Sequence, residues 1–246
     1  MDQLAHMNFG DLQRGYLEAG DRWCKHNVFT RSSALQEQLI VECQNLLLEI
    51  KAYKRAAQSK NNDEIANKCL HMQCMTNSIK SSLGMWVALK SKKFAESWSL
   101  LVDSQEYVGI ARQIEDYEGA RLLSERLRCV ERSVFPAWSL YSSPGFTETI
   151  GDCSVCGHSF NGCQHIEGHI YCGRYCRRVN RKIIDVDHSA LVTEPRDRRC
   201  IINSLSDDDG DMISNFTYEK TGKKSDGSGI ATIETTIMSF STLDLD

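Results

Sequence analysis

The stretch Cys153–Cys176, CSVCGHSFNGCQHIEGHIYCGRYC, holds five cysteines and three histidines, and the rest of the chain shows no comparable crowding. Thiolates and imidazoles are the ligands that zinc prefers in proteins. A short segment with so few apolar residues also needs something other than a hydrophobic core to order it. The stretch therefore predicts a zinc-binding module, and its position divides the rest of the chain into parts.

The predicted metal site begins at the Cys-x-x-Cys pair Cys153 and Cys156, with Gly157 directly behind it. Two thiolates on a tight turn can both reach one Zn²⁺ at about 2.3 Å, and a following glycine lets the backbone fold around the sulfurs. A tetrahedral ion then needs two more ligands. The candidates are Cys163, His165, Cys172 and Cys176, with His158 and His169 as less favoured alternatives.

The end of the stretch, GRYCRRVNRKI, predicts a helix from about Gly173, because its apolar residues share one helical stripe. Cys176 would then lie in the first turn, where the helix dipole favours a thiolate. Cys172 would lie on a strand and is the weakest candidate. The expected ligands are Cys153, Cys156, His165 and Cys176, with Cys163 in place of His165 as the main variant.

Residues 153–183 resemble a treble-clef or zinc-ribbon-like zinc finger, in which a knuckle and a hairpin precede a helix that supplies the last ligand. The resemblance implies a closed structural Zn²⁺ site. Four protein ligands leave no open position for a substrate, so we expect no catalytic residues here.

The same segment also resembles part of an HNH-type nuclease, through the sequence CQHI around His165. That resemblance implies a metal-dependent nuclease in which Asn180 or His188 supplies a later residue of the motif. Gln164, however, stands where the family has an acidic metal ligand, and an amide binds Mg²⁺ poorly compared with a carboxylate. Nuclease activity is therefore the alternative to a binding function.

The first 135 residues contain none of the three prolines, and their apolar residues recur every three or four positions. Short polar breaks between the stripes favour an antiparallel helical bundle. Ser32 or Ser33 is the expected N-cap of the first strong helix. Strong stripes cover 35–57, 65–89 and 94–114, and weaker helices are expected at about 3–24 and 118–134.

The predicted fold class is α+β, with an all-α bundle over 1–135 and a zinc-binding hairpin-and-helix module over 151–203. Residues 136–150 contain two prolines and are expected to be a linker. Residues 204–246 are expected to be an acidic, Ser/Thr-rich tail with a strand or two and a mobile end. From 201 onward, three lysines stand against nine acidic residues, a net charge of −6.

The composition of the chain excludes some classes of function. The 246 residues carry a net charge of −4 and 41% hydrophobic residues, and their apolar runs fall far short of a membrane span. Eleven cysteines without an export signal indicate a reducing compartment, where metal binding is a common use of cysteine. We therefore expect a cytoplasmic protein without a membrane partner.

The basic residues near the predicted site offer a partner surface on the expected helix. A protein partner is favoured over nucleic acid, because the acidic tail would compete with phosphate for these side chains. We expect a non-enzymatic adaptor or regulator, with an HNH-like nuclease or another nucleic-acid-processing protein as the alternative. The surface residues are Arg174, Arg177, Arg178, Arg181 and Lys182.

Overall fold

The computed structural model describes two compact units, which together make the chain α+β, as the sequence predicts. One unit comprises residues 1–127, 150–182 and 243–246, and the other comprises 128–149 and 183–242. The described residues are 8–28, 30–137, 140–225, 231–236 and 243–246.

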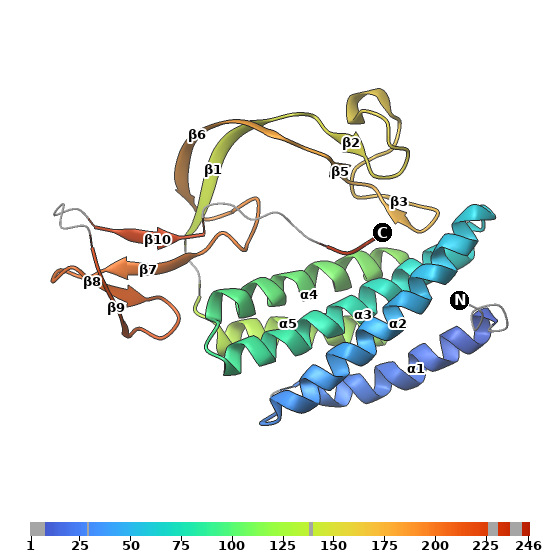
Figure 1. Cartoon of the computed structure of the whole chain (residues 1–246), viewed down its shortest axis with the longest axis horizontal. Coiled ribbons are helices and arrows are strands. Elements are labelled where there is room, and N and C mark those ends of the chain that lie inside the picture. The colour runs from blue at the N-terminus through green and yellow to red at the C-terminus, as the bar shows by residue number, and fades with distance from the viewer. Residues whose placement is uncertain (1–7, 29, 138–139, 226–230, 237–242) are drawn as a thin grey trace. The chain divides into compact units, whose positions relative to one another are not determined.

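Five helices open the chain, as the apolar stripes predict (Figure 1). The N-cap of the second helix is Ser32, whose hydroxyl accepts a hydrogen bond from the Leu35 amide at 3.1 Å. The Asn62 side chain caps the third helix in the same way, through the Ile65 amide. The helices are α1 (Phe9–His26), α2 (Ser33–Ser59), α3 (Asp63–Lys90), α4 (Phe94–Ile114) and α5 (Glu118–Val134).

Helix α3 lies between α2 and α4 and packs against both. It buries 18 of its 28 residues, so it is the centre of the helical core. Cys69 and Cys74 are fully buried there, and Trp98 on α4 is also fully buried. These three residues belong to the core.

The Cys-rich segment of the same unit consists of short paired strands. Strand β2 (Asp152–Cys153) pairs antiparallel with β5 (Arg178–Val179), and β3 (Ile170–Tyr171) pairs with β4 (Arg174–Tyr175). A single 3-10 turn, η2, covers Phe160–Gly162.

The prediction of a helix from Gly173 is wrong, because β4 and β5 occupy that part of the chain. Cys172 has φ 45° and Gly173 has φ 67°, and two successive positive values form the tight turn between β3 and β4. This turn reverses the chain where the helix should begin. The shared apolar stripe of GRYCRRVNRKI therefore reflects short strands.

In the second unit, β1 (Tyr141–Glu148) pairs antiparallel with the ten-residue β6 (Ile183–Val192). The expected linker 136–150 thus contains a strand. Gly145 faces His188 across the pair, and a Cβ at Gly145 would lie 2.4 Å from the imidazole ring. A larger residue at this position would therefore displace the exposed His188 ring.

The part of the chain expected to be an acidic tail contributes a four-stranded antiparallel sheet in the order β10-β7-β8-β9. The sequence DDDGD, residues 207–211, is a turn between two of these strands, in which the Asp207 carboxylate accepts hydrogen bonds from the Asp209 and Asp211 amides. Residues 226–230 and 237–242, which belong to the expected mobile part of the tail, lie outside the described part of the chain. The strands are β7 (Ile202–Ser206), β8 (Asp211–Ser214), β9 (Lys220–Lys224) and β10 (Ile233–Thr235).

Within the described ranges, none of the helices is long and apolar enough to cross a bilayer.

Candidate metal centre

The Cys-x-x-Cys knuckle is a tight turn held by its own backbone. The Gly157 amide donates to the Cys153 carbonyl at 2.8 Å, and Gly157 has φ 74°, which favours glycine. The Cys153 amide donates to the His158 carbonyl at 2.8 Å, and the Val155 amide lies 3.4 Å from the Cys153 sulfur. These bonds turn the loop around the two sulfurs, as the sequence predicts for a metal knuckle.

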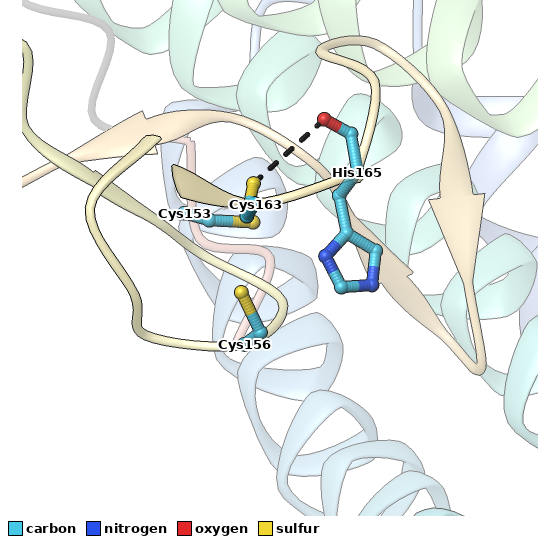
Figure 2. Close-up of side chains that lie close together, drawn as sticks. All are labelled: Cys153, Cys156, Cys163 and His165. Carbon is cyan, nitrogen blue, oxygen red and sulfur yellow. Dashed lines mark hydrogen bonds between the residues drawn. The ribbon is translucent and has the colours of Figure 1, made fainter. Parts of the chain in front are cut away.

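The second pair of possible metal ligands, Cys163 and His165, comes from the loop that follows η2. The Cys163 sulfur lies 3.6 Å from the Phe160 carbonyl and 3.9 Å from the His165 carbonyl, and Figure 2 shows the latter contact as a dashed line. The His165 ring packs edge-on against Tyr171, with 4.6 Å between the ring centroids. Its Nδ1 is buried and has no hydrogen-bond partner among the described residues. An imidazole nitrogen left in that state suits metal ligation.

Four side chains converge at this point. One ligand atom from each of Cys153, Cys156, Cys163 and His165 lies within 4.8 Å of all the others (Figure 2). Ligands of a tetrahedral zinc ion lie about 3.5–3.8 Å apart, so a small contraction of the cluster would fit the ion. The donor set and its spacing therefore suit a metal ion.

Cys176, a predicted ligand, lies beside this cluster and is not one of its four members. Its buried sulfur is 3.8 Å from the Cys153 sulfur. Ser154 holds it there, because the Ser154 hydroxyl donates to the Tyr175 carbonyl and accepts from the Arg177 amide, both at 3.0 Å. The structure thus brings Cys163 and His165 together at the knuckle, although the sequence analysis treated them as alternatives.

The two neighbouring thiols differ in acidity. Burial raises the pKa of Cys153, but hydrogen bonds from the Cys156 and Val155 amides and from the thiols of Cys163 and Cys176 outweigh it and bring the pKa down to about 7. Burial, together with the neighbouring Cys153 sulfur, raises the pKa of Cys176 to about 12. Cys153 is therefore ready to act as a thiolate, and Cys176 is suited to donate its S–H to it.

The remaining candidates lie apart from the cluster. Cys172 is in the β3–β4 turn, where its carbonyl accepts a hydrogen bond from Gln58 of α2 at 3.0 Å. The next residue, Gly173, donates its amide to Asn67 of α3 at 2.7 Å. This turn therefore attaches the Cys-rich segment to the helices. His158 and His169 are both exposed.

The basic side chains expected to form one surface are engaged by the chain itself. Arg174 donates to the Val155 carbonyl at 3.1 Å, and Arg177 donates to the Leu243 carbonyl at 3.0 Å. Arg178 lies 3.5 Å from the Glu167 carboxylate, and Arg181 and Lys182 also make interactions within the chain. Because short strands replace the expected helix, these residues do not share one helical face.

The residues on which the nuclease resemblance rests are not gathered on a helix. Asn180 follows β5 with φ 56°, and its amide donates to the Asp152 carboxylate at 2.9 Å. His188 lies on β6 of the second unit, where it contacts Asp187.

The chain matches no protein-family model, no curated protein and no solved structure. The structure itself defines a Cys₃His cluster that could hold a metal ion.

One polar cluster in the helical core is not predicted from the sequence. Lys54, Gln73 and Asn77 are at most 2% exposed, and they contact residues 244 and 245 at the other end of the sequence. The sequence feature that could have indicated this cluster is the pair Gln73 and Asn77. These two amides are spaced i, i+4 in the interior of a long apolar helix.

Proposed function

We propose that Cys153, Cys156, Cys163 and His165 bind one structural Zn²⁺, and that the protein is a non-enzymatic adaptor or regulator. The observation that carries the proposal is the convergence of the four ligand atoms to within 4.8 Å. Compared with the set expected from sequence, this set keeps Cys153, Cys156 and His165 and takes Cys163 in place of Cys176.

The donor set favours zinc. Three thiolates and one imidazole in a compact cluster form a common structural zinc set, and the four side chains would complete a tetrahedral shell. Cys176 supports the site from outside that shell, because its S–H lies beside the Cys153 sulfur. Hydrogen bonds to ligating sulfurs orient such ligands and tune the metal.

A closed zinc site argues for binding rather than catalysis, because a catalytic zinc keeps a position open for water or substrate. The nature of the partner follows from the basic side chains. Arg174, Arg177 and Arg178 already contact carbonyls or carboxylates of this chain, which leaves fewer of their N–H groups free for phosphates. This supports a protein partner over nucleic acid.

Metal analysis and a binding titration test the two parts of the proposal. Protein purified under reducing conditions should carry one Zn²⁺ per chain, and Cys163→Ser should lose it. A filter-binding titration with duplex DNA should show no tight, salt-sensitive binding. Zinc-free protein would contradict the metal site, and a steep salt dependence of tight binding would favour the nucleic-acid alternative.

A further inference from the structure

The last four residues of the sequence, Leu243-Asp244-Leu245-Asp246, belong to the same compact unit as the helices, although residues 183–242 belong to the other. Leu243 is 9% exposed and Leu245 is 3% exposed. The segment belongs to no helix or strand, so side-chain burial and specific polar contacts are what hold it.

Buried polar side chains of α2 and α3 bind the backbone of this segment. Gln73 and Asn77 each donate a side-chain amide to the Asp244 carbonyl, at 2.9 and 3.1 Å. Lys54 donates to the Leu245 carbonyl and, at 2.7 Å, to the Gln73 side chain. Buried polar groups without partners are costly, so the carbonyls of this segment satisfy side chains that would otherwise be unpaired in the core.

The surrounding contacts recognise the rest of the segment. The Asp244 amide donates to the Tyr107 hydroxyl at 2.6 Å, and the Asp244 carboxylate pairs with Lys51. Arg177 donates to the Leu243 carbonyl at 3.0 Å, and it lies 3.4 Å from the Asp246 carboxylate. The contacts thus involve main-chain atoms, two alternate buried leucines and two alternate carboxylates of the segment. Main-chain bonds combined with pockets for alternate side chains are a general mode of peptide recognition.

We propose that the side chains contacting residues 243–246 form a recognition site for an extended acidic peptide of the pattern Leu-Asp-Leu-Asp. Residues 243–246 occupy this site in cis, and a segment of the same pattern from a protein partner replaces them. The inference rests on the proposed adaptor function for the existence of a partner, but it does not depend on the metal. A segment tethered in cis competes at a high effective concentration, so the site is closed to weak ligands and open to a partner that matches the pattern.

Fluorescence anisotropy with a labelled peptide of the sequence Ser-Thr-Leu-Asp-Leu-Asp tests the site. The full-length double variant Leu243→Ser/Leu245→Ser, in which the segment in cis is weakened, should bind this peptide at least about tenfold more tightly than the unchanged protein. Adding Asn77→Ala should weaken that binding by about tenfold, because a peptide carbonyl loses a buried donor. The matched control is the same peptide with both leucines replaced by serine, which should not bind.

Equal peptide affinities for the double variant and the unchanged protein would overturn the proposal, as would an Asn77→Ala variant that binds normally. If the double variant does not fold, hydrogen exchange on the unchanged protein decides the question. Millimolar free peptide should accelerate exchange of the Asp244 amide, because it displaces the segment from the Tyr107 hydroxyl. An unchanged exchange rate would make residues 243–246 a permanent part of the core.

The two proposals can fail separately. A protein that ignores the peptide but still captures a partner through another surface would contradict this site and leave the adaptor function standing. A protein that binds the peptide but captures no macromolecule in its native host would contradict the adaptor function instead.

Discussion

Helix α3 and the Cys-rich segment 150–182 belong to one compact unit, yet they are ordered in different ways. The helix buries 18 of its 28 residues, and most of the buried ones are apolar. Of residues 150–182, all of which the structure describes, only Cys153, Gly173 and Cys176 are buried. The helices are therefore held by apolar burial, and the Cys-rich segment by hydrogen bonds, two short strand pairs and its cysteine cluster.

This difference has an energetic consequence. Each fully buried large apolar side chain contributes about 1.5–3 kcal/mol, while ordering one residue's backbone costs about 1–2 kcal/mol. A segment without large buried apolar side chains cannot offset that cost by burial alone. Structural zinc binding contributes about 10 kcal/mol or more in small zinc modules, so a bound metal would offset part of that cost.

Removal of the metal should therefore have the largest effect, and this effect should fall on the Cys-rich segment and not on the helices. A strong chelator, or Cys153→Ser, should leave residues 150–182 open to proteolysis, because about 10 kcal/mol of binding energy is lost there. The helices should keep most of their circular dichroism, because their core does not include the cluster. Limited proteolysis with mass spectrometry and far-ultraviolet circular dichroism measure the two effects.

The matched control is Cys129→Ser, since Cys129 is exposed on α5. It should change neither the protease pattern nor the zinc content. Loss of helical signal on chelation would show instead that the two regions fold as one cooperative structure.

Single cysteine substitutions should distinguish the proposed zinc ligands from the nearby cysteines by their effect on zinc affinity. Cys163→Ser removes a proposed ligand and should lower zinc affinity by about 100-fold or more. Cys176→Ser should lower it less, by about tenfold, because it removes a hydrogen bond to a ligating sulfur. Cys172→Ser should leave it unchanged, since Cys172 lies in the turn on the helices.

Competition with a chromophoric chelator gives these affinities. Greater loss in Cys176→Ser than in Cys163→Ser would restore the ligand set expected from sequence.

A change in the helical core should show the converse behaviour. Trp98 is fully buried, so Trp98→Ala should lower the free energy of unfolding of the helices by about 3–5 kcal/mol. Zinc content should stay at one per chain. The control Leu122→Ala, at a 54% exposed position on α5, should change stability by less than about 0.5 kcal/mol. Urea unfolding followed by circular dichroism measures both, and zinc loss in Trp98→Ala would mean that the regions are coupled.

The smallest expected effect is a pH dependence from Lys54. Burial lowers its pKa to about 8 in the folded protein, whereas an unfolded lysine titrates near 10.4. The unfolded chain therefore holds more protons between these values, and stability should rise with pH from about 8 to about 10.4. The gain attributable to Lys54 should reach no more than about 3 kcal/mol.

The measurement is urea unfolding at several pH values, with Lys54→Met as the reference that lacks this titration. A parallel pH dependence of the two proteins would mean that the Lys54 ammonium is not destabilised by its surroundings.

The same contrast explains what the sequence could predict. The helices follow from local signals, namely apolar spacing, absence of proline and the Ser32 cap. All five appear, but the first covers Phe9–His26 instead of about 3–24, and residues 1–7 lie outside the described part of the chain. The knuckle follows from Cys-x-x-Cys-Gly, which has one favourable local geometry. These features depend on residues close together in the sequence.

The features that sequence analysis missed depend on contacts between distant residues. Gly173 approaches the Ala66 carbonyl of α3 so closely that a Cβ would lie 2.6 Å from it, and this docking favours the β3–β4 turn over a helix. The β1–β6 pairing joins segments about forty residues apart, so the prolines of 136–150 suggested only a linker. The burial of Lys54 depends on residue 245, which no local pattern reveals.

Metal stoichiometry tests the central claim most directly. Native mass spectrometry of freshly reduced, full-length protein, alongside Cys163→Ser, measures the zinc bound to each chain. The proposed site predicts one Zn²⁺ on the unchanged protein and none on Cys163→Ser at the same free-zinc concentration. A zinc-free unchanged protein whose segment 150–182 still resists proteolysis would contradict the claim that a metal orders this region.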